Sequence, residues 1–246
     1  MLQPDEFLTS GCPVLNSNLR GGINRKGLTE IYGQSGTGKT QLALQLCLTV
    51  QIPIAAGGLG AGAAYICTES VFPTRRLLQL LKTFPNVEKY NITGDSVFIE
   101  HVSTIEDLEM CVIRRIPILM ESQKIGLIIL DSIAAPYRVE YSDSELKNRA
   151  RSLRSIGYQL HILSFKNRIP VVCINQVTAV VKSDCVDNLL SKEQPALGIT
   201  WANLVSNSLY LYKSEDHRYV CVKKSSYVPR TVIKFNISDS GVFGIA

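Results

Sequence analysis

The sequence predicts an α/β fold in which a mostly parallel central sheet is flanked by helices and followed by antiparallel strands near the C-terminus. Short apolar runs alternate with helical patterns up to residue 175, as they do when parallel strands are joined by helices. The run 125–130 is continuous and β-branched, which is typical of a central strand buried on both faces. Beyond residue 205, strand-like segments follow one another with turn residues between them, which indicates antiparallel pairing.

The expected elements can be placed in chain order. Parallel strands are predicted where short apolar runs occur, at residues 28–32, 63–67, 96–101, 125–130 and 169–175. Helices are predicted where apolar residues recur with helical spacing, at residues 40–51, 74–82, 104–115 and 144–167. Thr104 and Asp107 resemble a capping box at the start of the third helix. Antiparallel strands are predicted at residues 206–212, 219–224, 231–236 and 241–245.

One long connection interrupts this pattern. Residues 177–198 show little periodicity and exceed the usual length of a connection in a compact domain. Such a segment is expected to be either functional or disordered. Because no linker divides the chain, we expect an N-terminal lead-in segment, 1–20, and one core domain, 21–246.

The composition excludes several classes of protein. With 46% apolar and 19% charged residues in a chain of 246, a sizeable core can form, and the pattern of a disordered chain is absent. No run approaches the roughly 18 apolar residues of a membrane span, and the first residues lack the pattern of a secretory signal. The seven cysteines are scattered without C-x-x-C spacing, which predicts neither a disulfide framework nor a zinc site. We therefore expect a soluble protein of a reducing compartment, without a membrane partner.

The positive charge is concentrated in the second half of the chain. The net charge is −1 over residues 1–131 and +6 over residues 132–246. This asymmetry hints at a polyanionic partner for one surface, although from charge alone a solubilising surface is the favoured explanation of an excess of this size.

The most specific motif is GQSGTGKT, between the predicted strand 28–32 and the predicted helix 40–51. It matches the phosphate-loop pattern G-x-x-x-x-G-K-[ST] in the structural context that the pattern requires. Glycines let backbone N–H groups turn toward phosphate oxygens, and the following helix adds the positive end of its dipole. The lysine reaches the β- and γ-phosphates, and the threonine hydroxyl binds Mg²⁺. We expect ATP and Mg²⁺ as ligands, held by Gly33, Gln34, Ser35, Gly36, Thr37, Gly38, Lys39 and Thr40.

A second motif supports the first. Asp131 ends the apolar strand 125–130, where phosphate-loop NTPases place an acid that holds Mg²⁺. An aspartate after a strand is also a common turn former or helix N-cap. Its position beyond the phosphate loop favours the metal role, so Thr40 and Asp131 are the predicted metal-binding pair.

Hydrolysis also needs a group that orients the attacking water. Glu69 follows the predicted strand 63–67, and Gln176 follows the predicted strand 169–175. Because parallel strands end at the same edge of a sheet, both side chains are expected near the phosphates. A carboxylate there can position water, and an amide can sense the γ-phosphate. A solvated helix cap is the alternative role for Glu69.

Together these segments resemble the RecA/RadA recombinase family, and within it the eukaryotic recombinase paralogues. The segments that carry the resemblance cover most of residues 11–212 and read GCPVLNSNLRGGI, GLTEIYGQSGTGKTQLALQLCL, GAAYICTES, FPTRRLLQL, LIILDSIAAPYRVEY, VVCINQVT and PALGITWANLVSNSLYL. The resemblance implies a RecA-like P-loop NTPase core over residues 21–246. The predicted phosphate loop then corresponds to the Walker A loop and Asp131 to the Walker B acid. Lys39, Glu69 and Gln176 correspond to the catalytic residues, with Gln176 coupling the nucleotide to DNA.

The resemblance also implies partners. The segments after Pro136 and Gln176 correspond to two DNA-facing loops, with Arg138, Arg149 and Arg151 in or beside the first and Lys182 and Lys192 in the second. In the family, ATP lies between neighbouring subunits, so we expect another RecA-like paralogue, the C-type, across the ATP interface. Single-stranded or branched DNA is the expected polymer. The expected location is the nucleus, with some protein in the cytoplasm.

The sequence departs from the family in three places. The family's N-terminal helical domain and its aromatic-x-x-Ala linker are expected to be missing. The second loop carries Asp184, Asp187 and Glu193 and lacks paired glycines, which weakens the case for DNA binding by that loop. Lys224 stands where an acidic residue is expected, and either contacts a neighbour's γ-phosphate or lies on a solvated strand face.

Three functions compete. The first is an ATP-binding, DNA-binding paralogue with weak, DNA-stimulated ATPase activity that assists a strand-exchange recombinase in double-strand break repair. The second is an assembly subunit whose ATP only stabilises an interface. The third is a small-molecule kinase, which would need a lid over its acceptor that the sequence does not suggest.

Overall fold

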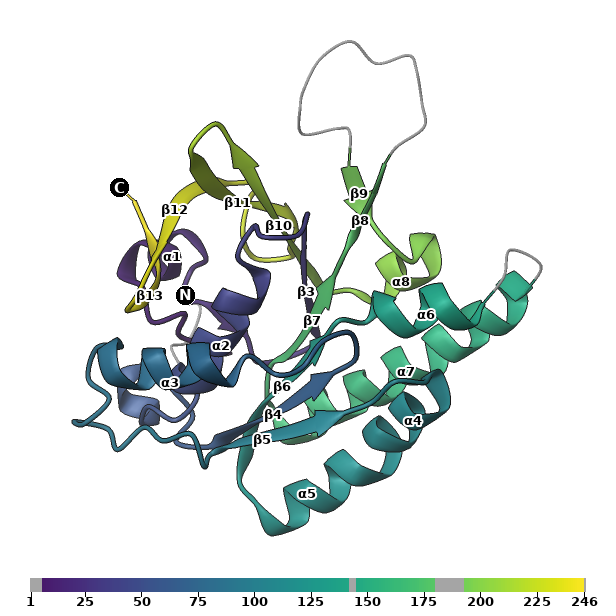
Figure 1. Cartoon of the computed structure of the whole chain (residues 1–246), viewed down its shortest axis with the longest axis horizontal. Coiled ribbons are helices and arrows are strands. Elements are labelled where there is room, and N and C mark those ends of the chain that lie inside the picture. The colour runs from purple at the N-terminus through teal and green to yellow at the C-terminus, as the bar shows by residue number, and fades with distance from the viewer. Residues whose placement is uncertain (1–5, 142–144, 180–192, 246) are drawn as a thin grey trace.

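The computed structural model describes residues 6–141, 145–179 and 193–245 of the chain. Its centre is a nine-stranded sheet in the order β13-β12-β11-β10-β3-β7-β6-β4-β5 (Figure 1). The strands of this sheet are β3 (Leu28–Tyr32), β4 (Gly62–Cys67), β5 (Val97–His101), β6 (Ile125–Asp131), β7 (Val171–Asn175), β10 (Asn207–Ser214), β11 (His217–Lys224), β12 (Val232–Ser238) and β13 (Gly241–Gly244). Neighbouring strands from β10 to β5 run parallel, and β10 to β13 pair antiparallel. The predicted fold class is confirmed.

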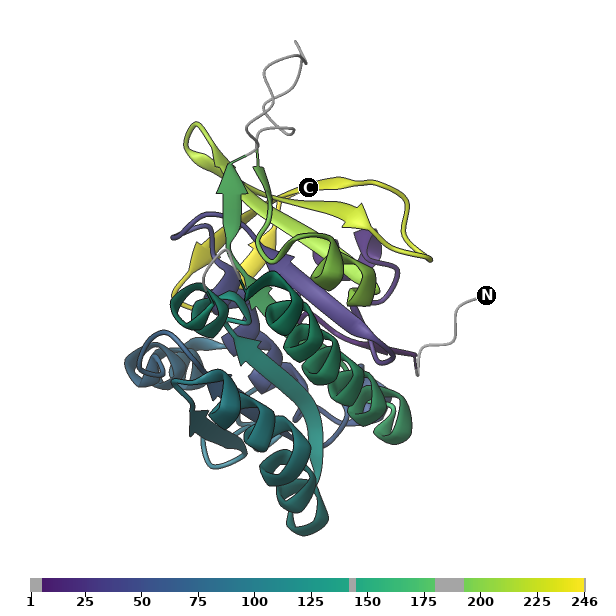
Figure 2. The ribbon, with the colours of Figure 1, turned by 90° about the vertical axis from the view of Figure 1, so that its right-hand side faces the viewer.

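Helices cover both faces of this sheet (Figure 2). They are α1 (Pro13–Asn18), α2 (Lys39–Thr49), η2 (Ile54–Ala56), α3 (Thr74–Thr83), α4 (Ile105–Met110), η3 (Cys111–Arg115), α5 (Ile116–Ser122), α6 (Ala134–Glu140), α7 (Leu146–Asn167) and α8 (Gly198–Leu204). Side chains of α1, α2 and α3 share one apolar core with one face of the sheet. Side chains of α4, α6, α7 and α8 share the second core with the other face. A sheet buried on both faces explains why its central strands are apolar without alternation.

The carboxyl ends of the parallel strands meet at one edge of the sheet. Tyr32 pairs with Asn175 at the ends of β3 and β7, and Cys67 pairs with Asp131 at the ends of β4 and β6. The residues that follow these strands therefore face the same space, where open α/β sheets bind their ligands.

Several elements differ from the sequence prediction. The helix expected to end at Arg115 continues through the π-helical turn η3 into α5, whose first turn contains Pro117. Pro117 follows the π-helical turn, which interrupts the regular i→i−4 hydrogen bonds. At the true start of a helix, proline is tolerated in the first turn because the missing N–H has no intrahelical partner there. The same rule admits Pro136 into α6, so the segment expected to be a DNA-facing loop is helical as far as Glu140.

The two described ends of the long connection pair with each other. Its ends form the antiparallel pair β8 (Val177–Ala179) and β9 (Glu193–Pro195), which projects from the sheet in both ribbon views, and α8 follows directly (Figure 1). Near the N-terminus, β1 (Phe7–Leu8) pairs with β2 (Ile23–Asn24). Within the described residues no helix is long and apolar enough to cross a membrane.

Candidate functional site

The phosphate loop turns sharply between β3 and α2. Gly38, the residue before α2, has a left-handed φ of 111°, which glycine adopts without strain. A Cβ at Gly33 would collide with the backbone oxygen of Leu211, so the loop also needs glycine where it passes β10. The N-terminus of the eleven-residue helix α2 then points its free N–H groups at the loop.

Lys39 begins α2 and folds back over the loop. Its Nζ donates to the backbone oxygens of Gly33 and Gln34, each at 2.8 Å. Burial lowers the pKa of Lys39, while the nearby carboxylates of Asp131 and Glu69 raise it. The ammonium group is thus held at the loop, facing two acids.

Asp131 is held by two hydroxyl groups. Its Oδ2 accepts hydrogen bonds from Thr40 Oγ1 at 3.0 Å and from Tyr65 Oη at 2.6 Å. Burial raises the pKa of Asp131, and the two hydroxyl donors together with Lys39 counteract that rise. The hydrogen bond to Thr40 brings the two predicted metal ligands together.

Glu69 and Gln176 meet across the ends of β4 and β7. Gln176 Nε2 donates to Glu69 Oε2 at 2.7 Å, and Ser132 Oγ donates to the same oxygen at 3.4 Å. Gln176 Oε1 in turn accepts from the guanidinium of Arg138, which also reaches the Val177 backbone oxygen at 3.4 Å. The two predicted hydrolytic residues therefore share one hydrogen-bonded chain with an arginine of α6.

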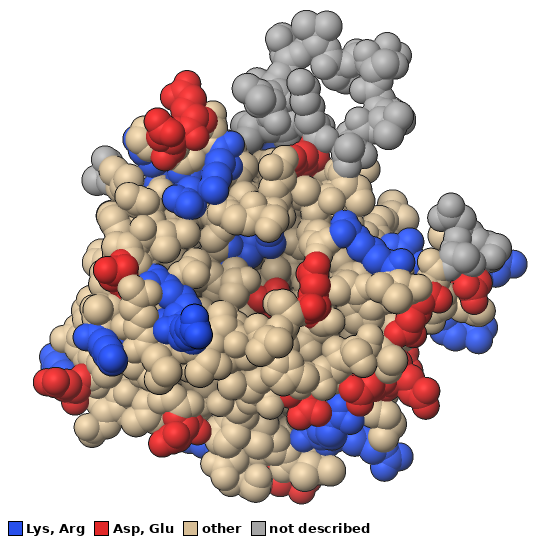
Figure 3. All heavy atoms as spheres, in the orientation of Figure 1, with Lys and Arg blue, Asp and Glu red and all other residues tan. Residues whose placement is uncertain are grey.

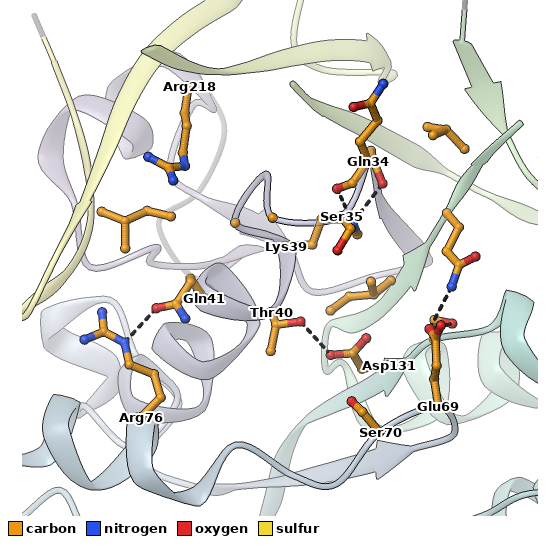
Figure 4. Close-up of a pocket in the computed structure, with 18 of the residues that line it drawn as sticks. Gln34, Ser35, Lys39, Thr40, Gln41, Glu69, Ser70, Arg76, Asp131 and Arg218 are labelled. Atoms are coloured by element: carbon orange, nitrogen blue, oxygen red, sulfur yellow. Dashed lines mark hydrogen bonds between the residues drawn. The ribbon is translucent and has the colours of Figure 1, made fainter. Parts of the chain in front are cut away.

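Two further arginines line the other side of the phosphate loop (Figure 4). The Arg76 guanidinium is fixed by Gln41 Oε1 at 2.7 Å and by the Ser238 backbone oxygen at 2.6 Å, with further bonds to Gln79 and Asp239. Arg218 comes from β11 and faces the same space. Because a guanidinium group is planar, it can stack on a flat ring such as the base of a nucleotide.

These groups enclose one cavity of about 1090 Å³. Lys39, Thr40, Asp131 and Glu69 all point into it (Figure 4). The oxygen atoms that could act as metal ligands fit a magnesium ion, because Mg²⁺ takes one or two protein oxygens and completes its octahedral coordination with water and phosphate. Thr40 Oγ1 and Asp131 Oδ2 are the atoms that would hold it.

The predicted DNA-binding residues that the structure describes are spread over two helices. Arg138 lies in α6 and lines the cavity, while Arg149 and Arg151 lie in the first half of α7. Lys182 and Lys192 lie outside the described residues. On the face seen in Figure 3, the described basic side chains are interspersed with acidic ones.

Lys224 is bound within its own chain. Its Nζ donates to the backbone oxygens of Ala202 at 3.0 Å and Val205 at 2.6 Å, at the C-terminal end of α8. A cation at this end of a helix interacts favourably with the dipole and satisfies free carbonyl groups. To reach a neighbour's γ-phosphate, as one of the two hypotheses requires, the Lys224 ammonium group would have to give up these two hydrogen bonds.

Sequence reasoning missed three contributors to the site. Tyr65 has the pattern of an ordinary core residue in an apolar strand, Arg138 is predicted from the sequence only to bind DNA, and nothing in the sequence distinguishes Arg218. No sequence signal marks Tyr65, because its place beside β6, opposite Ile129, follows from the strand register. For Arg138 the signal was its spacing of seven residues from Asp131.

Comparison with known proteins agrees with the resemblance found in the sequence. A Rad51 family model matches residues 6–245. DNA repair protein XRCC3 of Bos taurus is 40% identical over an alignment of 254 residues, gaps included; the alignment covers 97% of this chain and 74% of the cattle protein. The XRCC3 homologue of Arabidopsis thaliana is 38% identical over 232 residues, covering 85% and 76%. DNA repair protein RAD51 homolog 2 of Homo sapiens is 31% identical over 265 residues, covering 96% and 65%. The chain therefore belongs to the Rad51 family, in which it is similar to the XRCC3 proteins.

Proposed function

We propose that this protein binds ATP and Mg²⁺ in the cavity at the carboxyl edge of the sheet and acts in homologous-recombination repair of DNA double-strand breaks. One observation carries the nucleotide part of the proposal. Lys39, Asp131, Glu69 and Gln176 lie at or after the carboxyl ends of four parallel strands, Lys39 at the start of helix α2, and all line one cavity. This is the arrangement that phosphoryl chemistry needs, because catalysis there consists mainly of positioning and charge stabilisation.

Each residue has a distinct part in this proposal. The backbone of the phosphate loop and Lys39 bind the phosphates, while Thr40 and Asp131 hold the metal, which neutralises charge on the β- and γ-phosphates. Glu69 orients the attacking water, and Gln176 senses the γ-phosphate. The hydrogen bond between Glu69 and Gln176 links the water-positioning group to the start of β8. A change at the phosphate end is thereby passed to the segment expected to face DNA.

The DNA part of the proposal rests on relatives and on charge. The relatives reported above carry the name "DNA repair protein", and the second half of the chain carries the positive charge. Arg149 and Arg151, near the start of α7, and Arg138 in α6 are the described candidates for phosphate contacts. We place this activity in the nucleus, on single-stranded or branched DNA.

The partner is proposed to be a second RecA-like paralogue, of the C-type, that closes the ATP site from outside. The cavity is open to solvent where Gln34, Ser35 and Gly36 are exposed, so a neighbouring subunit has access to the loop. In such a heteromeric complex the paralogue would assist the strand-exchange recombinase.

The alternative is an assembly subunit with little turnover. It is favoured by the state of Glu69, whose Oε2 is engaged by both Gln176 and Ser132. The variants Lys39→Ala and Lys39→Arg distinguish a protein that turns ATP over from an assembly subunit. Lys39→Ala removes the cation at the phosphates, and Lys39→Arg keeps a cation there while changing the position of its charge. Loss of repair activity by both variants, with partner binding intact, supports turnover; repair activity retained by both contradicts it.

A further inference from the structure

A carboxylate lies in the middle of the sheet, in the strand before the phosphate loop and outside the lining of the cavity. Glu30 is the central residue of β3, two positions before the strand ends, and only 1% of its surface is exposed. Burying a carboxylate is unfavourable unless it is hydrogen-bonded, and an apolar residue would pack a buried strand at lower cost. The sequence around it, LTEIY, is otherwise that of a fully buried strand.

Three donors from three different elements converge on Glu30. Oε1 accepts from Asn175 Nδ2 at 2.7 Å and from Trp201 Nε1 at 2.9 Å, and Oε2 accepts from Ser208 Oγ at 3.0 Å. Burial raises the pKa of Glu30, and these three donors counteract the rise. The carboxylate thus joins β7, α8 and β10 to the strand that leads into the phosphate loop.

One of these contacts continues to the cavity. Asn175 Oδ1 accepts the backbone N–H of Gln176 at 2.8 Å, at the point where the chain leaves β7. Asn175 Nδ2 also donates to the backbone oxygen of Ala196, which follows β9. The Asn175 amide group is therefore fixed on both sides, with the Glu30 carboxyl group as the acceptor on one of them.

We propose that Glu30 is a positioning residue of the nucleotide site: by holding the Asn175 amide, it fixes the backbone at Gln176 and thereby the place of the Gln176 side chain beside Glu69. This inference rests on the proposed function for its effect on ATP turnover. Its structural part, the hold on Gln176, stands on the hydrogen bonds alone. A merely structural Glu30 would stabilise the sheet without any particular effect at Gln176.

Four variants separate these roles. Glu30→Gln keeps an acceptor oxygen for Asn175 and Trp201, and the Ser208 hydroxyl can turn to accept from the new amide. In Glu30→Met the new side chain has a similar length, but its sulfur is only a weak hydrogen-bond acceptor for Asn175 and Trp201. Glu30→Asp keeps a carboxylate but withdraws it by one methylene, which gives a second test if Glu30→Met does not fold. Ser208→Ala is the matched control, because it removes a bond to the same carboxylate outside the path to Gln176.

The first readout needs no nucleotide. Hydrogen exchange of the Gln176 backbone amide, measured by NMR, is compared with exchange of core amides in β6 within the same sample. We expect exchange at Gln176 to rise at least about tenfold relative to those core amides in Glu30→Met and Glu30→Asp, which corresponds to about 1.4 kcal/mol. Little change is expected in Glu30→Gln and Ser208→Ala. A uniform rise over the sheet, or none at Gln176, overturns the proposal.

The second readout is single-turnover hydrolysis beside ATP affinity. Glu30→Met and Glu30→Asp are expected to keep ATP affinity within about threefold and to lose turnover by on the order of 10²-fold, the loss that a misplacement of about 1 Å can cause. Glu30→Gln is expected to restore it. If Glu30→Met binds ATP and hydrolyses it at the wild-type rate, the proposal for Glu30 is overturned, whereas the proposal that the protein binds ATP is not affected. A wild-type protein that binds no ATP defeats the proposed function instead, and hydrogen exchange then still decides whether Glu30 holds Gln176.

Discussion

Tyr65 Oη donates a 2.6 Å hydrogen bond to Asp131 Oδ2, the same oxygen that accepts from Thr40 at 3.0 Å. Tyr65 is 1% exposed, and β4 and β6 pair so that Cys67 lies opposite Asp131. The acid proposed to hold the metal is therefore oriented by the core of the sheet as well as by the helix that carries the phosphate loop. Partners of this kind orient metal ligands and tune their affinity.

The first prediction concerns Tyr65→Phe. It removes only the hydroxyl that orients Asp131, so we expect Mg²⁺-dependent ATP affinity to fall about 10- to 100-fold. Because the hydroxyl donates to a charged acceptor, its removal should lower the free energy of unfolding by about 1–3 kcal/mol. Titration of ATP binding with Mg²⁺ measures the first effect and urea unfolding the second.

Tyr137→Phe is the matched control. Tyr137 is equally buried, but its hydroxyl bonds to Ser152 at 2.9 Å, which does not line the cavity, whereas the Tyr65 hydroxyl bonds to Asp131, which does. It should reduce stability and leave the Mg²⁺ dependence unchanged. Equal losses of Mg²⁺ affinity in the two variants would show that the Tyr65 hydrogen bond to Asp131 has no special part in metal binding.

The second prediction concerns pH and Asp131. Burial raises the pKa of Asp131 above its ordinary value of 3.8. The folded chain then keeps a proton at pH values where the unfolded chain has released it, so this contribution to stability is present at low pH and is lost as pH rises through the raised pKa. Asp131→Asn removes that dependence and keeps an acceptor for Tyr65.

Without nucleotide, Asp131→Asn should exceed the wild type in free energy of unfolding by about 0.5–2 kcal/mol at neutral pH, as is common when a functional residue strains the fold. The difference should shrink as pH falls toward the ordinary pKa of aspartate. Urea unfolding over this pH range measures it. A difference that is independent of pH would contradict the assignment to Asp131 ionisation.

The third prediction concerns Lys224. Lys224→Met removes the ammonium group that binds the Ala202 and Val205 carbonyls, so the free energy of unfolding should fall by about 1 kcal/mol. Thermal unfolding measures this loss, with Lys124→Met, at an exposed position outside the helices, as control. ATP turnover in the paralogue complex should be unchanged; a loss of turnover without a change in hydrogen exchange at Gln176 would instead support a role at the neighbour's phosphate.

The sequence predicted the fold class and most residues of the candidate nucleotide site. The phosphate loop, Asp131, Glu69 and Gln176 could be assigned to one edge because each follows an apolar strand, and local pattern is enough to locate strand ends. The helical segments around Pro117 and Pro136 were missed because a proline in the sequence usually marks a helix boundary. In the structure Pro117 follows a π-helical turn, and Pro136 lies in the first turn of α6.

The supporting hydrogen bonds could not be predicted in the same way. Tyr65 and Asp131 are 66 residues apart, and Glu30 and Asn175 are 145 apart. Such pairs depend on the order and register of strands, which local periodicity does not encode. The one visible sign was chemical: a glutamate within the buried run LTEIY requires donors, and only the assembled sheet shows where they come from.

The fourth prediction concerns DNA. If Arg138, Arg149 and Arg151 bind DNA phosphates, changing all three to alanine should flatten the log–log dependence of single-stranded DNA affinity on salt by about 0.7 for each phosphate that is no longer neutralised. The control changes three arginines exposed elsewhere, Arg75, Arg114 and Arg230. Fluorescence anisotropy over a range of salt concentrations measures both slopes. Equal slopes in the two triple variants would remove α6 and α7 from the DNA surface.

The fifth prediction tests the central claim, that ATP and Mg²⁺ bind in the cavity formed by the phosphate loop and Asp131. The measurement is an equilibrium titration with a fluorescent ATP analogue, with and without Mg²⁺, on the wild type, Lys39→Ala and the surface control Lys166→Ala. We predict saturable binding that requires Mg²⁺, is weakened by at least about tenfold in Lys39→Ala, and is unchanged in the control. Binding that ignores both Mg²⁺ and Lys39, or no binding by the wild-type chain with its partner paralogue present, would contradict the claim.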